Sequence, residues 1–165
     1  MNILIPRNIE GRKEKLKQMN IKLLSQEVID GALMLDESFM DINPKFVKLK
    51  KVNGVVSLEE KQWTEIPEWL KNVEITGAFW CSGNKLSTMK NCPQKIGGSL
   101  FCSYNKLTSL EGCPEIIGRD FSCSYNQLLS LEGSPKIIGG SFWCINNKNK
   151  LELPEYVKLK GDFYS

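Results

Sequence analysis

Hydrophobic and polar positions alternate in short runs that recur along most of the chain. The run 79–81 places Phe79 and Cys81 on one side of an extended strand and Trp80 on the other. Related runs follow at intervals of 21 residues, so cysteines stand at positions 81, 102, 123 and 144. A fixed period of this length predicts stacked units that share one hydrophobic core. Function is then expected on a repeated surface and not in a single cleft.

Turn residues separate the predicted strands. Positions 91, 112 and 133 are Asn, Gly and Gly, and an exchange between these two types indicates backbone with positive φ. Proline follows two residues later at 93, 114 and 135, which prevents the return segment from becoming a long helix. We therefore expect extended or short 3-10 segments on a convex side and parallel strands on a concave side.

Weaker copies of the unit reach both ends of this region. Upstream, 52–58 matches 75–81 with Leu58 at the cysteine position, and downstream 159–165 repeats the strand. The repeats then cover residues 52–165 as a solenoid of about six strands, which span about 24 Å at about 4.8 Å per strand. The final strand, with Tyr164 near its end, is a predicted edge that invites pairing with another chain, so we expect a weak homodimer there.

Residues 1–51 do not repeat, and we expect them to form an N-terminal helical capping region over the first repeat. Asn8 is placed to cap a helix that reaches about Met19. Ser25 is placed to cap a second helix with a broad apolar face. That face would consist of Val28, Ile29, Ala32, Leu33 and Leu35.

The aligned units share the pattern Leu100-x-Cys102-x-x-Asn105-x-Leu107-x-x-Leu110. This pattern resembles the leucine-rich repeat signature, with cysteine in place of its central strand leucine. Repeats of about 20 residues are typical of bacterial and phage members of that family, including effectors that act on host proteins. The resemblance implies a curved solenoid with its parallel sheet on the concave side, but it does not name a ligand.

The resemblance also implies a ladder of asparagine side chains that satisfy backbone groups in the adjoining loops. Its members would be Asn84, Asn105, Asn126 and either Asn147 or Asn149.

The cysteine column has a packing interpretation and a chemical one. Stacked strands place its thiols in a line, whereas zinc needs four ligands that converge tetrahedrally. Leu58 at the equivalent position favours packing, with cysteine acting as a small buried hydrophobe. Cys92 and Cys113 lie beside turn prolines and are candidates for greater exposure, but neither has a base nearby in the sequence. We expect reduced thiols, no metal site and no cofactor.

Composition favours one small non-enzymatic domain. The chain has 165 residues, of which 41% are hydrophobic and 25% charged, and it contains no histidine, so Ser–His and Cys–His pairs are impossible. It has no Gly-rich phosphate-binding motif and no recurring carboxylate pair. No apolar run has the length of a membrane span or the form of a signal peptide, so we expect a cytoplasmic protein.

The outward strand position is aromatic where solvation would favour polar residues. Its column reads Ser57, Trp80, Phe101, Ser122, Trp143 and Tyr164, and Tyr104 and Tyr125 flank the same face. Aromatic side chains bury a large area with few rotatable bonds, so we expect them to bind a partner. Ser122 leaves a gap of roughly 10 Å between Phe101 and Trp143, where a partner side chain can insert. Alternatively, the rings stack on one another and protect the sheet.

Lysines line one margin of that face, namely Lys85, Lys106 and Lys148, with Gln127 interrupting the row. Such a row either keeps the solenoid dissolved or steers an acidic partner. Lysines beside aromatics also suit single-stranded nucleic acid, but the net charge is only +3, and Asp120 and Asp162 lie on the same strands.

Together these features predict a protein that binds another protein. The resemblance implies a bacterial or phage product that inhibits or redirects a host or competing protein, in the host cytoplasm if it is an effector. A solenoid that binds single-stranded nucleic acid and an architectural, self-assembling subunit are the alternatives.

Overall fold

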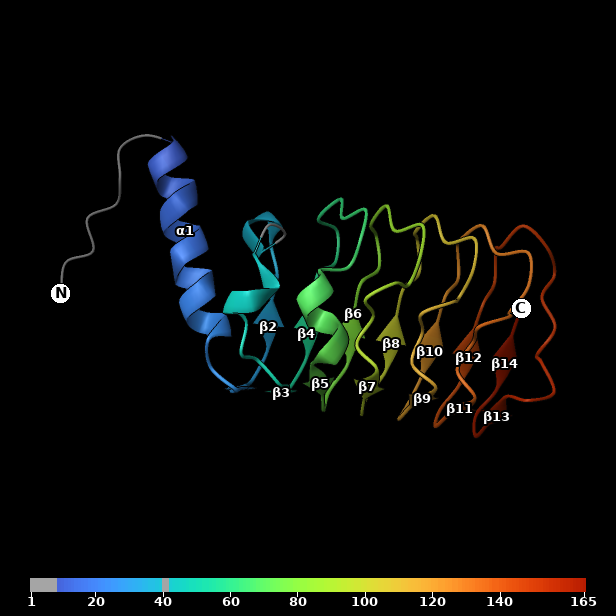
Figure 1. The fold of residues 1–165 in the computed structure, drawn as a ribbon. Helices are drawn as coiled ribbons and strands as arrows, with labels where there is room; N and C mark the ends of the chain where they lie inside the picture. The colour runs from blue at the N-terminus through green and yellow to red at the C-terminus, as the bar shows by residue number, and fades with distance from the viewer. Residues whose placement is uncertain (1–8, 40–41) are drawn as a thin grey trace.

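The computed structural model describes residues 9–39 and 42–165, which form a parallel β-solenoid with one α-helix at its N-terminal end (Figure 1). Each turn of the solenoid, here called a coil, contributes one strand to each of two sheets. The elements are α1 (Ile9–Leu24), β1 (Val28–Asp30), β2 (Leu33–Met34), η1 (Glu37–Phe39), η2 (Pro44–Phe46), β3 (Lys51–Asn53), β4 (Val56–Ser57), η3 (Glu68–Asn72), β5 (Glu74–Ile75), β6 (Phe79–Trp80), β7 (Lys95–Ile96), β8 (Leu100–Phe101), β9 (Ile116–Ile117), β10 (Phe121–Ser122), β11 (Ile137–Ile138), β12 (Phe142–Trp143), β13 (Lys158–Leu159) and β14 (Phe163–Tyr164), where η marks a 3-10 helix.

The two sheets have seven strands each, all paired in parallel, with the odd-numbered strands in one and the even-numbered strands in the other. We call them the odd sheet and the even sheet. Val28 pairs with Lys51, a step of 23 residues, whereas Glu74 pairs with Lys95, a step of 21. The longer early coils hold the 3-10 helices η1, η2 and η3 on the return side. The expected solenoid with parallel strands and 3-10 or extended return segments is thus confirmed.

The prediction of a second helix after Ser25 is wrong. Its residues instead form β1 and β2, which pair with β3 and β4. Ile29, Leu33 and Leu35 are buried in the positions that Val52, Val56 and Leu58 occupy one coil later. Gly31, with a φ of +100°, provides the turn between the two strands that a helix would not need. Parallel pairing therefore begins at Val28, upstream of the expected start at residue 52.

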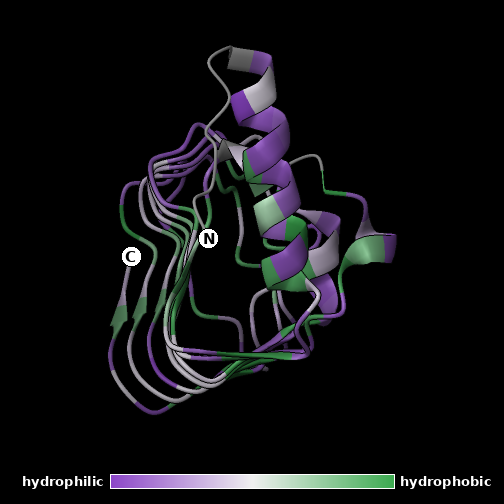
Figure 2. Ribbon diagram, turned by 90° about the vertical axis from the view of Figure 1, so that its left-hand side faces the viewer, coloured by the Kyte–Doolittle hydropathy of each residue, from purple (hydrophilic) through white to green (hydrophobic). Residues whose placement is uncertain are grey.

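The first predicted helix is present as α1, and it ends at Leu24 instead of near Met19. Asn8, its expected cap, lies outside the described residues. Leu24 is fully buried, and Ile21 and Leu23 pack against the core. The helix stands across the first coils when the solenoid is viewed end-on, with largely hydrophilic residues on its outside (Figure 2). It covers core that a first coil would otherwise expose.

Glycines make the corner between the two sheets. A Cβ atom on Gly118 would overlap the carbonyl oxygen of Gly97 on the preceding coil, and one on Gly139 would overlap that of Gly118. Side chains here would push neighbouring coils beyond strand spacing, so only glycine allows the stack. Gly118 and Gly139 therefore lie where the odd sheet meets the even sheet.

The described helices include none with the length and apolar character needed to cross a bilayer.

The asparagine ladder joins each coil to the one before it. The Asn105 Oδ1 accepts a hydrogen bond from the Leu86 N–H at 3.0 Å, and its Nδ2 donates to the carbonyls of Cys81 and Cys102 at 3.0 and 3.1 Å. Asn84, Asn126 and Asn147 make corresponding contacts. Asn147 is therefore the ladder residue, while Asn149 is exposed and donates to the Leu129 carbonyl.

Replacing Asn105 by alanine is expected to lower the free energy of unfolding by about 1–3 kcal/mol, because it leaves buried backbone groups unpaired. Chemical denaturation of the two proteins measures the difference. Asn149→Ala is the matched control, since it removes an exposed asparagine. Equal midpoints for Asn105→Ala and the parent would contradict the structural role of the ladder.

Candidate partner-binding face

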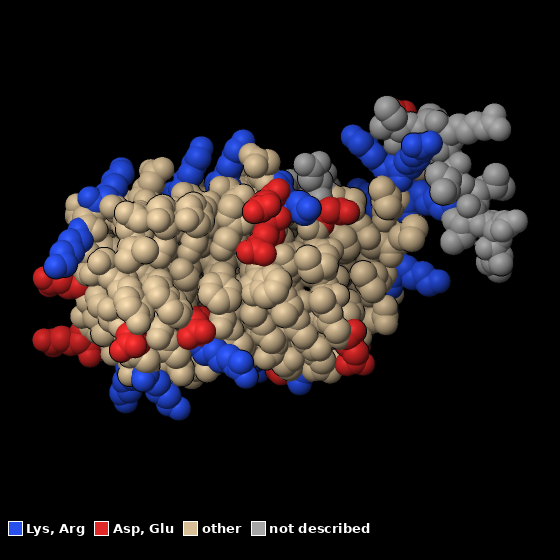
Figure 3. Space-filling view, turned by 180° about the vertical axis from the view of Figure 1, so that it is seen from behind, with Lys and Arg blue, Asp and Glu red and all other residues tan. Residues whose placement is uncertain are grey.

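The outer surface of the even sheet carries most of the predicted binding residues. Each even-numbered strand from β4 to β14 has two residues, of which the first points into the core and the second lies on the opposite side of the strand. Parallel pairing then aligns the second residues in one column: Ser57, Trp80, Phe101, Ser122, Trp143 and Tyr164. Ser57 is buried, so the accessible part of the column begins at Trp80. Figure 3 shows this face as a band largely without charged atoms.

Tyr104 and Tyr125 stand beside this column in a left-handed backbone conformation, with φ of +55° and +54°. The equivalent positions in neighbouring coils are Gly83 and Asn146, residue types that tolerate this conformation. For a bulky side chain it costs of order 1 kcal/mol or more. Both tyrosines are also well exposed, at 58% and 41%. The chain thus holds two accessible aromatic rings where a smaller residue fits the backbone better.

Four aromatic rings on this face form two stacked pairs. Tyr104 and Tyr125 have ring centroids 4.3 Å apart with planes 10° from parallel, and Trp143 and Tyr164 have centroids 5.6 Å apart with planes 4° from parallel. These separations are close to the strand spacing of about 4.8 Å, so the rings stack along the solenoid axis. Within each pair the facing surfaces cover each other, and the ring edges point outward. Self-stacking, the alternative to partner binding, accounts for these covered surfaces.

Free aromatic faces remain at the ends of the stacks. Tyr104 borders Gly83, which has no side chain, and Trp143 borders the small Ser122. The Tyr164 hydroxyl donates to the Asp162 Oδ2 at 3.2 Å, and the nearby carboxylate charge raises the pKa of Tyr164. The ring is therefore neutral at physiological pH. What the face offers is a set of ring edges and a few open ring faces.

Charged side chains border the band on both margins (Figure 3). Lys85, Lys106 and Lys148 are exposed, one in each of three coils, with Gln127 in the coil between the second and third. On the opposite margin, the Asp120 Oδ1 accepts a hydrogen bond from the Ser141 N–H at 2.9 Å. The lysine row thus lies after the strands and Asp120 lies before one of them, while charges of both signs occur on each margin.

The cysteine column lies behind this face, in the core. All six cysteines are free thiols. The Cys81 and Cys102 thiols donate to the carbonyls of Phe101 and Ser122 at 3.3 Å, which ties each coil to the next. Among the described residues, no group of three or more His, Cys, Asp or Glu side chains is arranged to hold a metal ion. Cys92, expected to be more accessible, is buried because its turn packs onto the core, and Cys113 is half-buried.

Burial raises the pKa of these thiols. The pKa of Cys81, Cys102 and Cys123 lies well above its usual value, and that of Cys144 is raised to about 12. Deprotonation at neutral pH would put a charge into the core, so the thiols lack the thiolate form that metal binding and nucleophilic attack need.

The protein is expected to lose stability as the pH rises above about 8.5, the ordinary pKa of an unfolded cysteine. Above it the unfolded chain releases thiol protons that the folded chain keeps, so each buried cysteine lowers the free energy of unfolding by up to about 1.4 kcal/mol per pH unit. Denaturation midpoints between pH 7 and 10 measure this slope. Cys102→Ala should have a shallower slope than the parent, and equal slopes would contradict the assignment.

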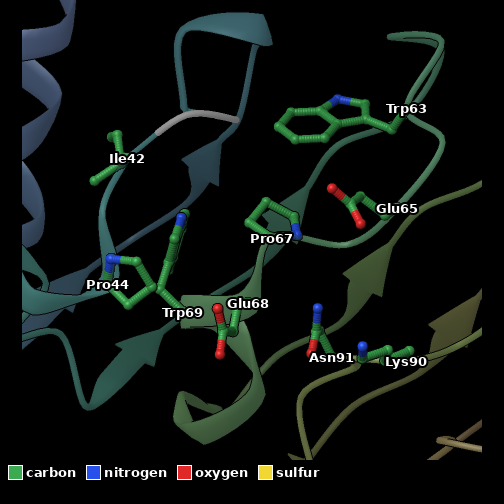
Figure 4. A pocket seen from close by; sticks show the side chains of 9 residues that line it. All are labelled: Ile42, Pro44, Trp63, Glu65, Pro67, Glu68, Trp69, Lys90 and Asn91. Atoms are coloured by element: carbon green, nitrogen blue, oxygen red, sulfur yellow. The ribbon is translucent and has the colours of Figure 1, made fainter.

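A separate pocket of about 370 Å³ lies near the N-terminal coils (Figure 4). Glu65, Glu68 and Lys90 are at its exposed rim, and Trp63 and Trp69 form part of its wall. The indole Nε1 atoms of both tryptophans lack a hydrogen-bond partner, but both are shielded from solvent. A ligand in the pocket therefore cannot reach these donors unless the rings move, and the aromatic face remains the better candidate site.

Comparisons with known protein families, with curated proteins and with solved structures found no match.

The sequence-based prediction places Tyr104 and Tyr125 on the face but does not include their left-handed backbone, which their alignment with Gly83 and Asn146 indicates. Replacing both Tyr104 and Tyr125 by asparagine is expected to change the free energy of unfolding by less than about 1 kcal/mol. Relief of backbone strain offsets the lost stacking, which is worth about 0.5–1.5 kcal/mol. Thermal and chemical denaturation measure the effect. A loss of several kcal/mol would mean that the tyrosines are there for stability.

Proposed function

We propose that this protein is a non-enzymatic binding module that contacts another protein through the outer face of the even sheet. The observation that carries the proposal is the pair Tyr104 and Tyr125, two exposed rings held in a backbone conformation that favours smaller residues. Strain that stability does not require is characteristic of functional positions. Their neighbours Trp80, Phe101 and Trp143 supply further apolar area on the same face.

The form of the face favours a protein partner over single-stranded nucleic acid. Bases bind such proteins by stacking on open aromatic faces, and here the paired rings cover much of that surface themselves. Tyrosine and tryptophan edges with hydroxyl and indole groups suit the mixed polar and apolar surface of a protein. Lys85 and Lys106 at one margin would speed encounter with an acidic partner surface.

We place the module, from its repeat pattern, among short leucine-rich-repeat proteins of the bacterial or phage type. In that class it acts in the cytoplasm, on a host or competing protein that it inhibits or redirects. A weak homodimer through the β14 edge remains a prediction, and light scattering across micromolar concentrations tests it.

Affinity capture from lysate tests the binding face with three proteins. These are the parent, the Tyr104→Asn/Tyr125→Asn variant, and an Ile116→Ser/Ile137→Ser variant on the outer face of the odd sheet. Ile116 and Ile137 are also exposed and apolar. The third protein therefore controls for non-specific binding through exposed apolar side chains. We expect the parent and the isoleucine variant to recover the same protein, and the tyrosine variant to recover at least tenfold less.

Equal recovery by the tyrosine variant, once its folding is verified by circular dichroism, would rule out this face. Recovery of nucleic acid in place of protein, weakening steeply as salt rises, would favour the nucleic-acid alternative. Assembly of the purified chain with itself and with nothing else would favour an architectural role.

A further inference from the structure

The coil that carries Ser122 differs from both neighbours at three positions on the candidate face. The preceding coil has Ser99, Phe101 and Lys106, and the following coil has Ser141, Trp143 and Lys148. The Ser122 coil has Asp120, Ser122 and Gln127 at the same positions. An aromatic ring and a lysine are thus missing from one coil, and an acidic side chain is added there.

The missing ring leaves a slot in the aromatic column. Ser122 pairs with Phe101 on one side and Trp143 on the other. Trp143 stacks on Tyr164 with one face, so its other face is turned toward Ser122. A planar group above Ser122 would lie about 4.8 Å from each neighbouring ring, one strand spacing away. That distance falls between the 4.3 and 5.6 Å centroid separations of the two ring pairs already on this face.

The floor of the slot is polar. The hydroxyl groups of Ser122 and Ser103 lie 2.7 Å apart in a hydrogen bond. Hydroxyl oxygens accept hydrogen bonds, so a group that donates several would fit this floor better than an apolar ring.

The Ser122 coil carries an acidic side chain, Asp120, and lacks the lysine that both neighbouring coils have, although Arg119 directly precedes Asp120 at the corner between the sheets. Asp120 lies two residues before Ser122 on the same side of the strand, about 7 Å along the chain. Its Oδ1 holds the Ser141 N–H, and its Oδ2 can accept a further bond. Gln127 removes the lysine that would repel a cation at the opposite end.

We propose that this slot receives an arginine side chain of the partner protein. The inference rests on the proposed function, and it names the chemistry that the face recognises. A guanidinium group is planar, stacks on aromatic faces, donates up to five hydrogen bonds and is always charged. It would stack between Phe101 and Trp143, donate to the Ser122 hydroxyl and pair with Asp120. Lysine lacks the planar group, and an aromatic side chain lacks the charge and most of the donors.

Short peptides test the slot without knowledge of the natural partner. The probes are acetyl-Gly-Arg-Gly-amide and its lysine and phenylalanine counterparts, titrated into isotope-labelled protein while amide and indole resonances are recorded. We expect the arginine peptide to shift the Ser122 amide and the Trp143 indole resonances at millimolar concentrations. The other two peptides should bind at least fivefold more weakly.

Three variants locate the effect. Asp120→Asn keeps an Oδ1 acceptor for the Ser141 N–H but removes the charge, and should weaken arginine binding at least threefold. Ser122→Phe supplies the missing ring from within, as Phe101 does one coil earlier, and should abolish binding while the protein stays as thermally stable as the parent. Gln127→Lys should also weaken binding.

Three results would overturn the proposal of an arginine slot: equal binding of the arginine and lysine peptides, tighter binding of the phenylalanine peptide, or no resonance shift with any peptide. The capture experiment separates this failure from failure of the proposed function. A partner that is recovered equally by the parent and by Ser122→Phe means that the face binds without an arginine in the slot. A partner that Tyr104→Asn/Tyr125→Asn also recovers means that the face itself is wrong.

Discussion

Parallel stacking of one coil on the next at a single strand spacing is the constraint on which the rest of the structure depends. It requires every coil to follow the same path, so each position lies beside its counterpart one period away. Where the path turns between sheets, as at Gly118, there is no room for a Cβ. Where the path leaves the sheet, loop amides that no strand can pair are satisfied by the ladder, as Asn105 does for Leu86. Glycine corners and asparagine ladders are thus two consequences of one geometric rule.

The same rule turns individual residues into columns, and columns have properties that single side chains lack. Cysteines that would be reactive alone become a line of buried, protonated thiols, and those of Cys81, Cys102 and Cys144 donate to carbonyls of the next coil. Aromatic rings spaced one strand apart are close enough to stack, and stacking turns their edges outward. A change in one coil therefore does more than remove a side chain. At Ser122 it places a small side chain between Phe101 and Trp143, which belong to the coils on either side.

Much of the fold could be predicted from the sequence, because each structural position recurs in several repeats and can be recognised by comparing them. The strand at Phe79, the turn glycines and the ladder asparagines were all visible as recurring positions. The first coil was missed because Val28 and Leu35 lie outside the cysteine pattern, and their apolar spacing suits a helix about as well as two short strands. The second sheet is also absent from the sequence-based prediction, which has extended or 3-10 segments opposite a single set of parallel strands. Whether such a segment forms a helix or strands is decided by pairing with residues distant in the sequence, and the local spacing of apolar residues contains no information about that pairing.

The sequence by itself determined the period, the burial of the cysteine column and the outward position of Trp80, Phe101 and Trp143, because strand alternation and repetition are local properties. Only the tertiary structure decided how these side chains meet. The left-handed backbone at Tyr104 and Tyr125 and the stacking of the rings in pairs become visible only when the coils lie in contact with one another. Those contacts depend on the distance and angle at which one coil rests on another, which no single repeat contains.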